Sequence, residues 1–239
     1  MLLVRYADLT YKPGQAVRQS NLAASSYRTS PIVLRKLAQR MAGLAAHNPE
    51  LALATADHVW QAEQAEMRQL AAVLIGNLPA EFSGEVLKRL QAWTVPGIDV
   101  SQMGSLFEQC SIQLRHSEPN QLLEIVRSWL DAPDIGMVRL GVIAITTLVS
   151  DHDFENLPAV YNAISPLLVI PHDELKHELR ALLVQLARRS PTETGYFLRQ
   201  VMGSNPSPEL TRLVRRVLPE FPEEIQNRIR GLLFAFQRE

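Results

Sequence analysis

Five arginines stand at related positions along this chain, each directly after an apolar residue and ahead of a helix-forming apolar run. The pairs are Leu34-Arg35, Met67-Arg68, Val138-Arg139, Leu179-Arg180 and Val214-Arg215. A guanidinium in such a place can bond carbonyls or carboxylates of a neighbouring element while its stem packs on the core. Alternatively, arginines on successive packed helices can form a row, spaced by about 10 Å, that follows a phosphate backbone. The sequence leaves both uses open.

Other residue types offer less chemistry. Cys110, the single cysteine, sits in an apolar helical context typical of a small core residue and allows no disulfide or thiolate metal site. The run Asp151-His152-Asp153 resembles a metal-binding cluster, but its place between helices favours turn and capping chemistry. His172 and His177 do not share a helix face. We expect no metal site and no cofactor, since Gly-rich phosphate loops and the GxSxG and HExxH motifs are missing from the sequence.

The spacing of the arginines indicates the elements that carry them. The steps between the arginines are 33, 71, 41 and 35 residues, which corresponds to one period of roughly 35 to 40 with a degenerate copy near Gly104. Helix starts of the type Ser30-Pro31, Asn48-Pro49, Ser190-Pro191 and Ser207-Pro208 punctuate the chain. Strand-like alternation is absent. The sequence therefore predicts an all-α superhelix of stacked helix pairs with about twelve helices.

Length and composition are those of an ordinary soluble protein, with 239 residues, 46% apolar and 21% charged. We expect one repeat domain over residues 30–239, preceded by a segment of residues 1–29 that is partly flexible or adds one helix around 15–24. No apolar stretch is long enough to cross a bilayer, and no signal peptide is recognisable. These features predict a cytoplasmic monomer without membrane contact.

The net charge of −1 argues against a protein coated in basic residues, but the charge is unevenly distributed. Residues 1–40 carry seven bases and one acid, a balance of +6, whereas residues 120–170 carry two bases and six acids, a balance of −4. Such runs are either solvated faces or, at the amino-terminal end, a patch that attracts phosphate.

Several segments together resemble the alkylpurine DNA glycosylase family, or DNA alkylation repair enzymes, which have HEAT-like repeats. These segments are Tyr27-Arg28-Thr29-Ser30-Pro31 with Leu34-Arg35-Lys36-Leu37, His58-Val59-Trp60 with Glu66-Met67-Arg68-Gln69-Leu70-Ala71, Gln91-Ala92-Trp93 through Asp99, Ser128-Trp129-Leu130-Asp131 with Met137-Val138-Arg139, and Glu178-Leu179-Arg180 with Ala187-Arg188. The resemblance covers most of the chain from residue 28 to residue 233.

The resemblance implies a HEAT-like solenoid whose basic concave face binds duplex or damaged DNA. It also implies an enzyme that removes N3- or N7-alkylated purines from this DNA without a deep base pocket. It assigns Asp99 as the carboxylate that stabilises the oxocarbenium-like sugar and orients water, and Trp93 as the surface that stacks on the cationic base. DNA contacts carried over from the family and from the arginine pattern are Arg139, Arg35, Lys36, Arg68, Arg180 and Trp129.

The sequence departs from the family pattern at two places. Five residues, Thr94 to Ile98, separate Trp93 from Asp99, one or two more than in active members. The second aromatic residue of the family's cleft falls near Gln185, where no indole is present. The sequence therefore leaves open whether the chain is an enzyme.

Each assigned residue also has a structural interpretation. Trp60, Trp93 and Trp129 lie at predicted helix ends, where indoles commonly pack. Asp99 precedes a helical run and suits an N-cap. Helical arrays also hold peptides or helices in the same groove, so a non-catalytic scaffold that binds a protein partner or structured DNA is the alternative function.

Overall fold

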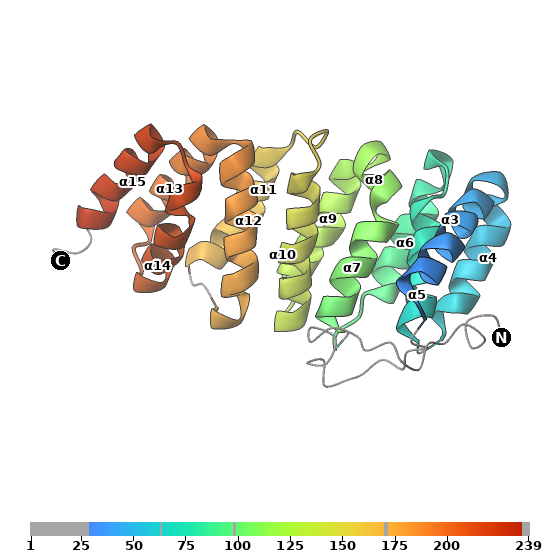
Figure 1. The fold of residues 1–239 in the computed structure, drawn as a ribbon. Coiled ribbons are helices and arrows are strands. Elements are labelled where there is room, and N and C mark those ends of the chain that lie inside the picture. Colours follow the sequence, from blue (N-terminus) through green and yellow to red (C-terminus); the bar gives the residue numbers. More distant parts are fainter. Residues whose placement is uncertain (1–28, 63, 98, 170–171, 236–239) are drawn as a thin grey trace. The chain divides into compact units, whose positions relative to one another are not determined.

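The computed structural model describes residues 29–62, 64–97, 99–169 and 172–235. Within these residues the chain forms thirteen α-helices, labelled α3 to α15, and no strand, which confirms the all-α prediction (Figure 1). The expectations for residues 1–28 lie outside the described part of the chain. Contacts divide the chain into two compact units, Met1–Leu122 (unit 1) and Leu123–Glu239 (unit 2).

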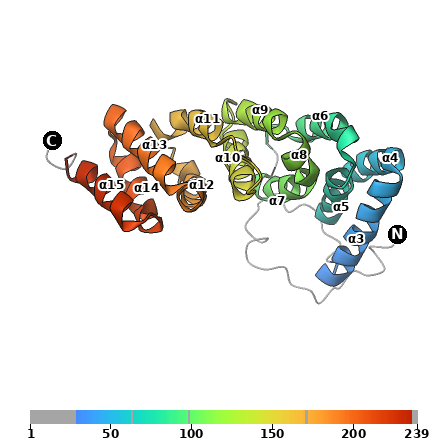
Figure 2. The ribbon, with the colours of Figure 1, turned by 90° about the horizontal axis from the view of Figure 1, so that it is seen from above.

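Unit 1 contains helices that pack in two layers. They are α3 (Pro31–His47), α4 (Pro49–Trp60), α5 (Ala65–Gly76), α6 (Ser83–Trp93), α7 (Val100–Cys110) and α8 (Ile112–Ser117), with the 3-10 turn η1 (Ala80–Phe82). Helix α5 contacts α3, α4 and α7. Helices α3, α5 and α7 form one layer, and α4 and α6 form the second layer, against one face of the first (Figure 2). Helix α9 (Pro119–Leu130) crosses the boundary between the units.

Unit 2 continues with helix pairs. It contains α10 (Ile135–Ser150), α11 (Leu157–Val169), α12 (Lys176–Arg189), α13 (Pro191–Ser204), α14 (Pro208–Val217) and α15 (Glu223–Ala235), with the 3-10 turns η2 (Asp173–Leu175) and η3 (Leu218–Glu220). Helix α12 contacts α10, α13 and α14, and α13 contacts α11 and α15. The unit therefore has one row of α10, α12 and α14 and a second row of α11, α13 and α15.

The helix starts predicted from proline are present. Helices α3, α4, α13 and α14 each begin at the proline of the predicted dipeptide, and α9 also begins at a proline, Pro119. At two of them the preceding side chain caps the helix: Asn48 Oδ1 accepts from the backbone N–H of Leu51 at 3.1 Å, and Ser207 Oγ accepts from that of Leu210 at 3.1 Å. These bonds satisfy N–H groups that the first helical turn leaves without partners.

Apolar side chains from both layers form the core of each unit. Leu74, Leu90 and Phe107 are fully buried in unit 1, and Leu140 and Leu182 are fully buried in unit 2. Cys110 is buried, as its context predicts, and burial raises the pKa of its thiol. The layer of unit 1 is tightest at Gly76, where an added Cβ would lie 2.0 Å from the carbonyl oxygen of Gln109.

No single helix in the described part of the chain has the length and apolar character needed to span a membrane. One helix pair, Ala65–Gly76 with Ala80–Trp93, passes the test jointly on length and composition, but it is bent by 114° at its break.

Candidate functional site

Two tryptophans and one arginine of unit 1 form a stack at the ends of three helices. Trp60 ends α4 and Trp93 ends α6, and their rings are parallel within 6° with centroids 4.1 Å apart. The guanidinium carbon of Arg68, in the first turn of α5, lies 5.4 Å from the centroid of a Trp60 ring. This distance is within cation–π range. One face of Trp93 is therefore already occupied by an indole, and only 8% of Trp93 is exposed.

Asp99 lies at the start of α7. Its Oδ1 accepts from the backbone N–H of Gln102 at 3.2 Å, and its carbonyl oxygen accepts from the N–H of Met103 at 2.8 Å. These two bonds are those of an N-cap residue. The preceding loop turns at Gly97, whose φ of +82° lies in the left-handed region that glycine adopts without strain. The capping role expected for Asp99 is thus present, and the carboxylate remains partly exposed.

Arg139 and Glu178 form an ion pair between α10 and α12 in unit 2. Nε and Nη2 of Arg139 both lie 2.6 Å from Oε1 of Glu178. The Arg139 side chain is 47% exposed, whereas that of Glu178 is only 7% exposed. The second carboxylate oxygen, Oε2, is buried and accepts no hydrogen bond within the described part of the chain. Of the two uses open to the patterned arginines, Arg139 therefore makes the carboxylate bond to a neighbouring helix.

Three other predicted cations are exposed. Arg35 and Lys36 lie in α3, and Arg180 lies in α12. None of the three side chains makes a hydrogen bond or ion pair with a described residue, whereas Arg188 and Arg189 in α12 do. Exposed, unpaired guanidinium and ammonium groups are what a phosphate backbone requires of a protein.

The arginine pattern fails at its last copy. Arg35, Arg68, Arg139 and Arg180 are the fourth or fifth residues of their helices, but Arg215 is the eighth residue of α14 and lies in its last turn. The fifth residue of α14 is Arg212, which pairs with Glu209 in the same helix. The carboxyl-terminal arginines of α14 correspond by position to Arg188 and Arg189 of α12.

Trp129 and Gln185, singled out from the family pattern, lie in unit 2. Trp129 is only 4% exposed near the end of α9, so its indole belongs to the core. Gln185 is partly buried in α12 beside the fully buried Leu182 and Leu186, and it supplies no aromatic face.

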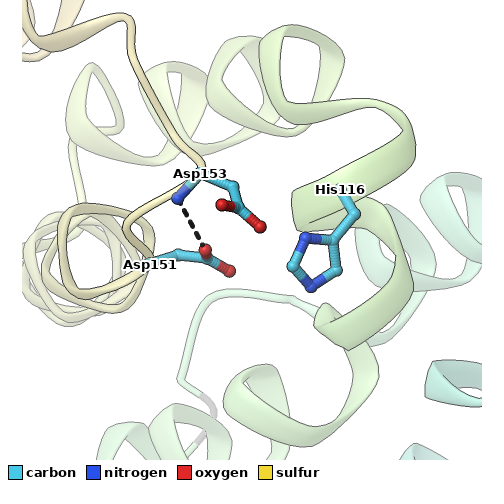
Figure 3. Close-up of side chains that lie close together, drawn as sticks. All are labelled: His116, Asp151 and Asp153. Carbon is cyan, nitrogen blue, oxygen red and sulfur yellow. Dashed lines mark hydrogen bonds between the residues drawn. The ribbon is translucent and has the colours of Figure 1, made fainter.

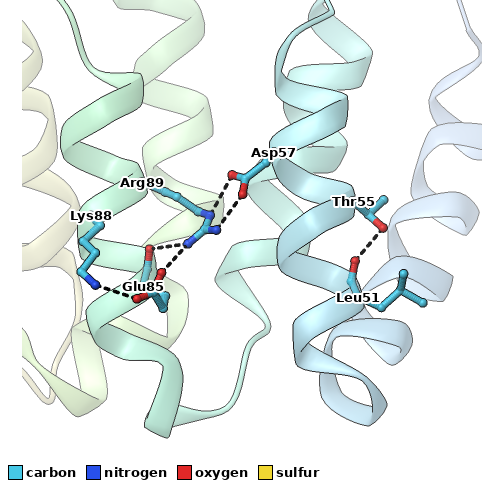
Figure 4. Close-up of polar contacts among 6 residues, drawn as sticks. All are labelled: Leu51, Thr55, Asp57, Glu85, Lys88 and Arg89. Atoms are coloured by element: carbon cyan, nitrogen blue, oxygen red, sulfur yellow. Dashed lines mark hydrogen bonds and ion pairs between the residues drawn. The ribbon is translucent and has the colours of Figure 1, made fainter.

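A charged network between α4 and α6 is not assigned by any sequence pattern (Figure 4). Nε and Nη2 of Arg89 donate to the two carboxylate oxygens of Asp57 at 2.8 and 2.6 Å, and Nη1 donates to Glu85 at 3.0 Å. Hydrogen bonds from Lys88 and Arg89 lower the pKa of Glu85, and the bond to Asp57 raises that of Arg89. Only the Glu85–Lys88–Arg89 spacing was readable in sequence, because Asp57 lies on another helix.

The acidic loop after α10 is held by its own chain and by α12. The backbone N–H of Asp153 donates to Oδ1 of Asp151 at 3.2 Å (Figure 3). The guanidinium of Arg189 donates to the carbonyl oxygens of Val149, Asp151, His152 and Phe154. The turn chemistry expected for this segment is present.

These features define an all-α protein built from stacked helix pairs, with cations at the starts of several helices. A family model described as DNA alkylation repair enzyme matches residues 29–228. Because the match covers most of the chain, the protein belongs to this family. The comparisons with curated proteins and with solved structures give no match.

Proposed function

We propose that this protein binds duplex DNA through cations near the amino-terminal ends of its helices and recognises alkylated purines. The observation that supports this proposal is the exposure of the cationic side chains. Arg35, Lys36 and Arg180 are exposed without an acidic partner in the described part of the chain, and Arg139 is half exposed. Membership in a family of DNA alkylation repair enzymes supports the same ligand.

A local arrangement of cations is sufficient for such binding despite the net charge of −1. Each cation that neutralises one phosphate releases condensed counterions, and this release provides affinity regardless of charges elsewhere on the surface. Some acids of the protein pair within their own helices, as Glu209 does with Arg212 and Glu224 with Arg228.

For the chemical step we propose hydrolysis of the N-glycosidic bond of 3- or 7-alkylpurines. The alkylated purine carries a positive charge and leaves readily, so a carboxylate beside the sugar supplies the main stabilisation. The Asp99 carboxylate is partly exposed and fixed by its bond to the N–H of Gln102, which suits this role. Trp93, stacked on Trp60, acts in this scheme by supporting the loop that carries Asp99.

DNA binding is tested with duplexes over a range of salt concentrations. We expect the logarithm of the binding constant to fall linearly with the logarithm of the salt concentration. Arg180→Ala should weaken binding to all sequences alike and lower the magnitude of the slope by about 1. Arg228→Ala is the matched control, because this exposed arginine is already paired with Glu224. Wild type that binds no duplex at low salt would refute the proposal.

The chemical step is tested separately with DNA containing 7-methylguanine. Asp99→Asn removes the carboxylate charge but keeps a good N-cap, so α7 should remain intact while excision is lost. Circular dichroism checks that the helix content is unchanged. If pure wild type leaves the 7-methylguanine in place, the protein is not this glycosylase.

A scaffold that binds a protein partner is the second candidate function, favoured by the burial of Trp93. The indole assigned to the cationic base is 8% exposed and faces another indole. A protein that failed to bind duplex, branched or gapped DNA at any salt concentration would support this candidate.

A further inference from the structure

The guanidinium of Arg139 uses only one of its edges. A guanidinium offers a side edge, made by the N–H groups of Nε and one Nη, and an end edge made by both Nη groups. In Arg139, Nε and Nη2 hold Oε1 of Glu178, which occupies the side edge. No described residue accepts a hydrogen bond from Nη1, and the side chain is 47% exposed. The end edge is therefore open to a ligand.

Glu178 is an unusual partner for a half-exposed arginine, because its own side chain is 7% exposed. Burying a carboxylate costs free energy unless its oxygens are bonded. Here Oε1 accepts from Nε–H and lies 2.6 Å from Nη2, and Oε2 remains buried without a partner within the described part of the chain. The pair does not have the two-oxygen fork geometry that most stabilises an arginine–carboxylate contact. Stability alone therefore accounts poorly for this arrangement.

The contact with Glu178 does fix the direction in which the Arg139 guanidinium points. Glu178 is the third residue of α12, and Arg139 reaches it from α10, so the guanidinium is held between the starts of two adjacent helices. A free arginine would lose side-chain entropy on binding a ligand, and a guanidinium already held on one edge loses less.

We propose that Glu178 is a positioning residue, which holds the side edge of Arg139 so that the end edge binds two oxygens of one DNA phosphate. This inference rests on the proposed DNA binding and names the contact through which one part of it occurs. Bidentate binding of phosphate by a planar guanidinium is strong and directional, and lysine cannot reproduce it.

The direction of the effect of Glu178→Gln separates positioning from simple neutralisation. If Glu178 only cancels the charge of Arg139, the substitution adds one net positive charge and DNA should bind more tightly. If Glu178 positions Arg139, the more mobile guanidinium should bind DNA more weakly, by about 5- to 10-fold. The two roles thus predict changes of opposite sign in the same measurement.

Glu220→Gln is the matched control. Glu220 pairs with Arg188 across two elements of the same unit at 2.9 Å, but both side chains are more exposed, at 30% and 60%. This substitution adds the same charge without changing Arg139. We expect it to leave duplex affinity unchanged within about twofold or to increase it.

A double-mutant cycle localises the effect. With Arg139→Ala already present, Glu178→Gln should cause no further loss of affinity, because no guanidinium remains to be positioned. Thermal unfolding of each variant identifies the temperature range in which all are folded. A loss that persists in the Arg139→Ala background would overturn the inference, as would equal or tighter binding by Glu178→Gln.

The state of Arg139 can be measured without DNA through the ¹H–¹⁵N signal of its Nε. A bonded Nε–H should give a separate, slowly exchanging signal in wild type that moves to the position of free arginine side chains in Glu178→Gln. If wild type lacks this signal, the positioning inference fails while DNA binding can still hold. If the signal is present but wild type binds no DNA, the proposed function fails and the phosphate contact fails with it.

Discussion

The first turns of α5 and α12 carry the same Glu-x-Arg sequence, Glu66 with Arg68 in unit 1 and Glu178 with Arg180 in unit 2. Both glutamates are buried. The arginines differ: Arg68 is half-buried and lies over the indole of Trp60, whereas Arg180 is exposed and has no partner among the described residues. The repeat therefore places an arginine near the start of each of these helices. The residues around that arginine determine whether its guanidinium packs against the protein or remains exposed to a ligand.

The residues that surround the two helix starts differ. In unit 1 the backbones of α5 and α7 come into direct contact at Gly76, and the ends of α4 and α6 bring two indoles to the start of α5. In unit 2 an added Cβ at Gly141 would lie 2.6 Å from Cδ2 of the Leu130 side chain and 3.2 Å from the backbone nitrogen of Leu130. Aromatic residues beside α5 give its arginine a packing partner that α12 lacks.

The two units should differ most in the stability that each loses when alanine replaces a glycine at a close contact. Gly76→Ala would place a Cβ 2.0 Å from a carbonyl oxygen of the α7 backbone, which cannot move without separating the helices. We expect a loss of about 3 kcal/mol or more in the free energy of unfolding. Gly141→Ala meets Cδ2 of Leu130 at 2.6 Å and the backbone nitrogen of Leu130 at only 3.2 Å, so rotation of the side chain relieves the closest contact and the loss should be smaller, about 1 to 2 kcal/mol.

Gly43→Ala is the control for both substitutions, because no described atom lies within 4 Å of an added Cβ at this interior position of α3. There alanine should stabilise the protein by about 1 kcal/mol through its higher helix propensity. Chemical denaturation measures all three variants. Equal losses for Gly76→Ala and Gly141→Ala would refute the contrast between a backbone contact and a side-chain contact.

Buried titratable groups give each unit its own response to alkaline pH. Burial raises the pKa of Cys110 in unit 1, and burial is also the largest cause that raises the pKa of Tyr161 in unit 2. A raised pKa in the folded state stabilises the protein below the unfolded pKa, and this stability is lost as the pH rises above it. The unfolded values are about 8.5 for cysteine and about 10 for tyrosine, so unit 1 should weaken first.

At pH 10, ionisation of Cys110 in the unfolded state should have lowered the free energy of unfolding by about 2 kcal/mol. Cys110→Ala should abolish the part of the loss that begins near pH 8.5, and Tyr161→Phe the part that begins near pH 10. Denaturation followed between pH 7 and pH 11 tests both. A stability that falls in the same way in Cys110→Ala and in wild type would contradict the assignment to the thiol.

The sequence was sufficient to predict the helices because their signals are local. Proline starts, apolar spacing and the burial of Cys110 depend on neighbours within a few turns, and the structure has them where the sequence places them. The misplacement of Arg215 has a local cause as well. Lys176 and Pro208, the first residues of α12 and α14, are 32 residues apart, so the step of 35 from Arg180 passes the equivalent Arg212 and reaches the last turn of α14.

The site residues were less predictable, because their partners come from other helices. Trp60 and Trp93 are 33 residues apart in sequence, yet their rings stack. Glu178 was visible as part of a motif, but its partner Arg139 lies 39 residues away. A sequence pattern identifies a charged residue without showing which helix faces it, so it could not separate the packed Arg68 from the exposed Arg180.

The smallest expected effects are those of substitutions at Arg68 and Arg180. Arg68→Met keeps most of the apolar stem but removes the cation over Trp60, so it should lower the stability of the protein by about 0.5 to 1 kcal/mol and change tryptophan fluorescence. Arg180→Met should change neither, because Arg180 is exposed and unpaired within the described part of the chain. Duplex affinity should show the reverse order, with a loss in Arg180→Met and little change in Arg68→Met. If Arg68→Met weakened DNA binding as much as Arg180→Met at unchanged stability, both arginines would face the ligand, and the division between a packed and an available cation would be wrong.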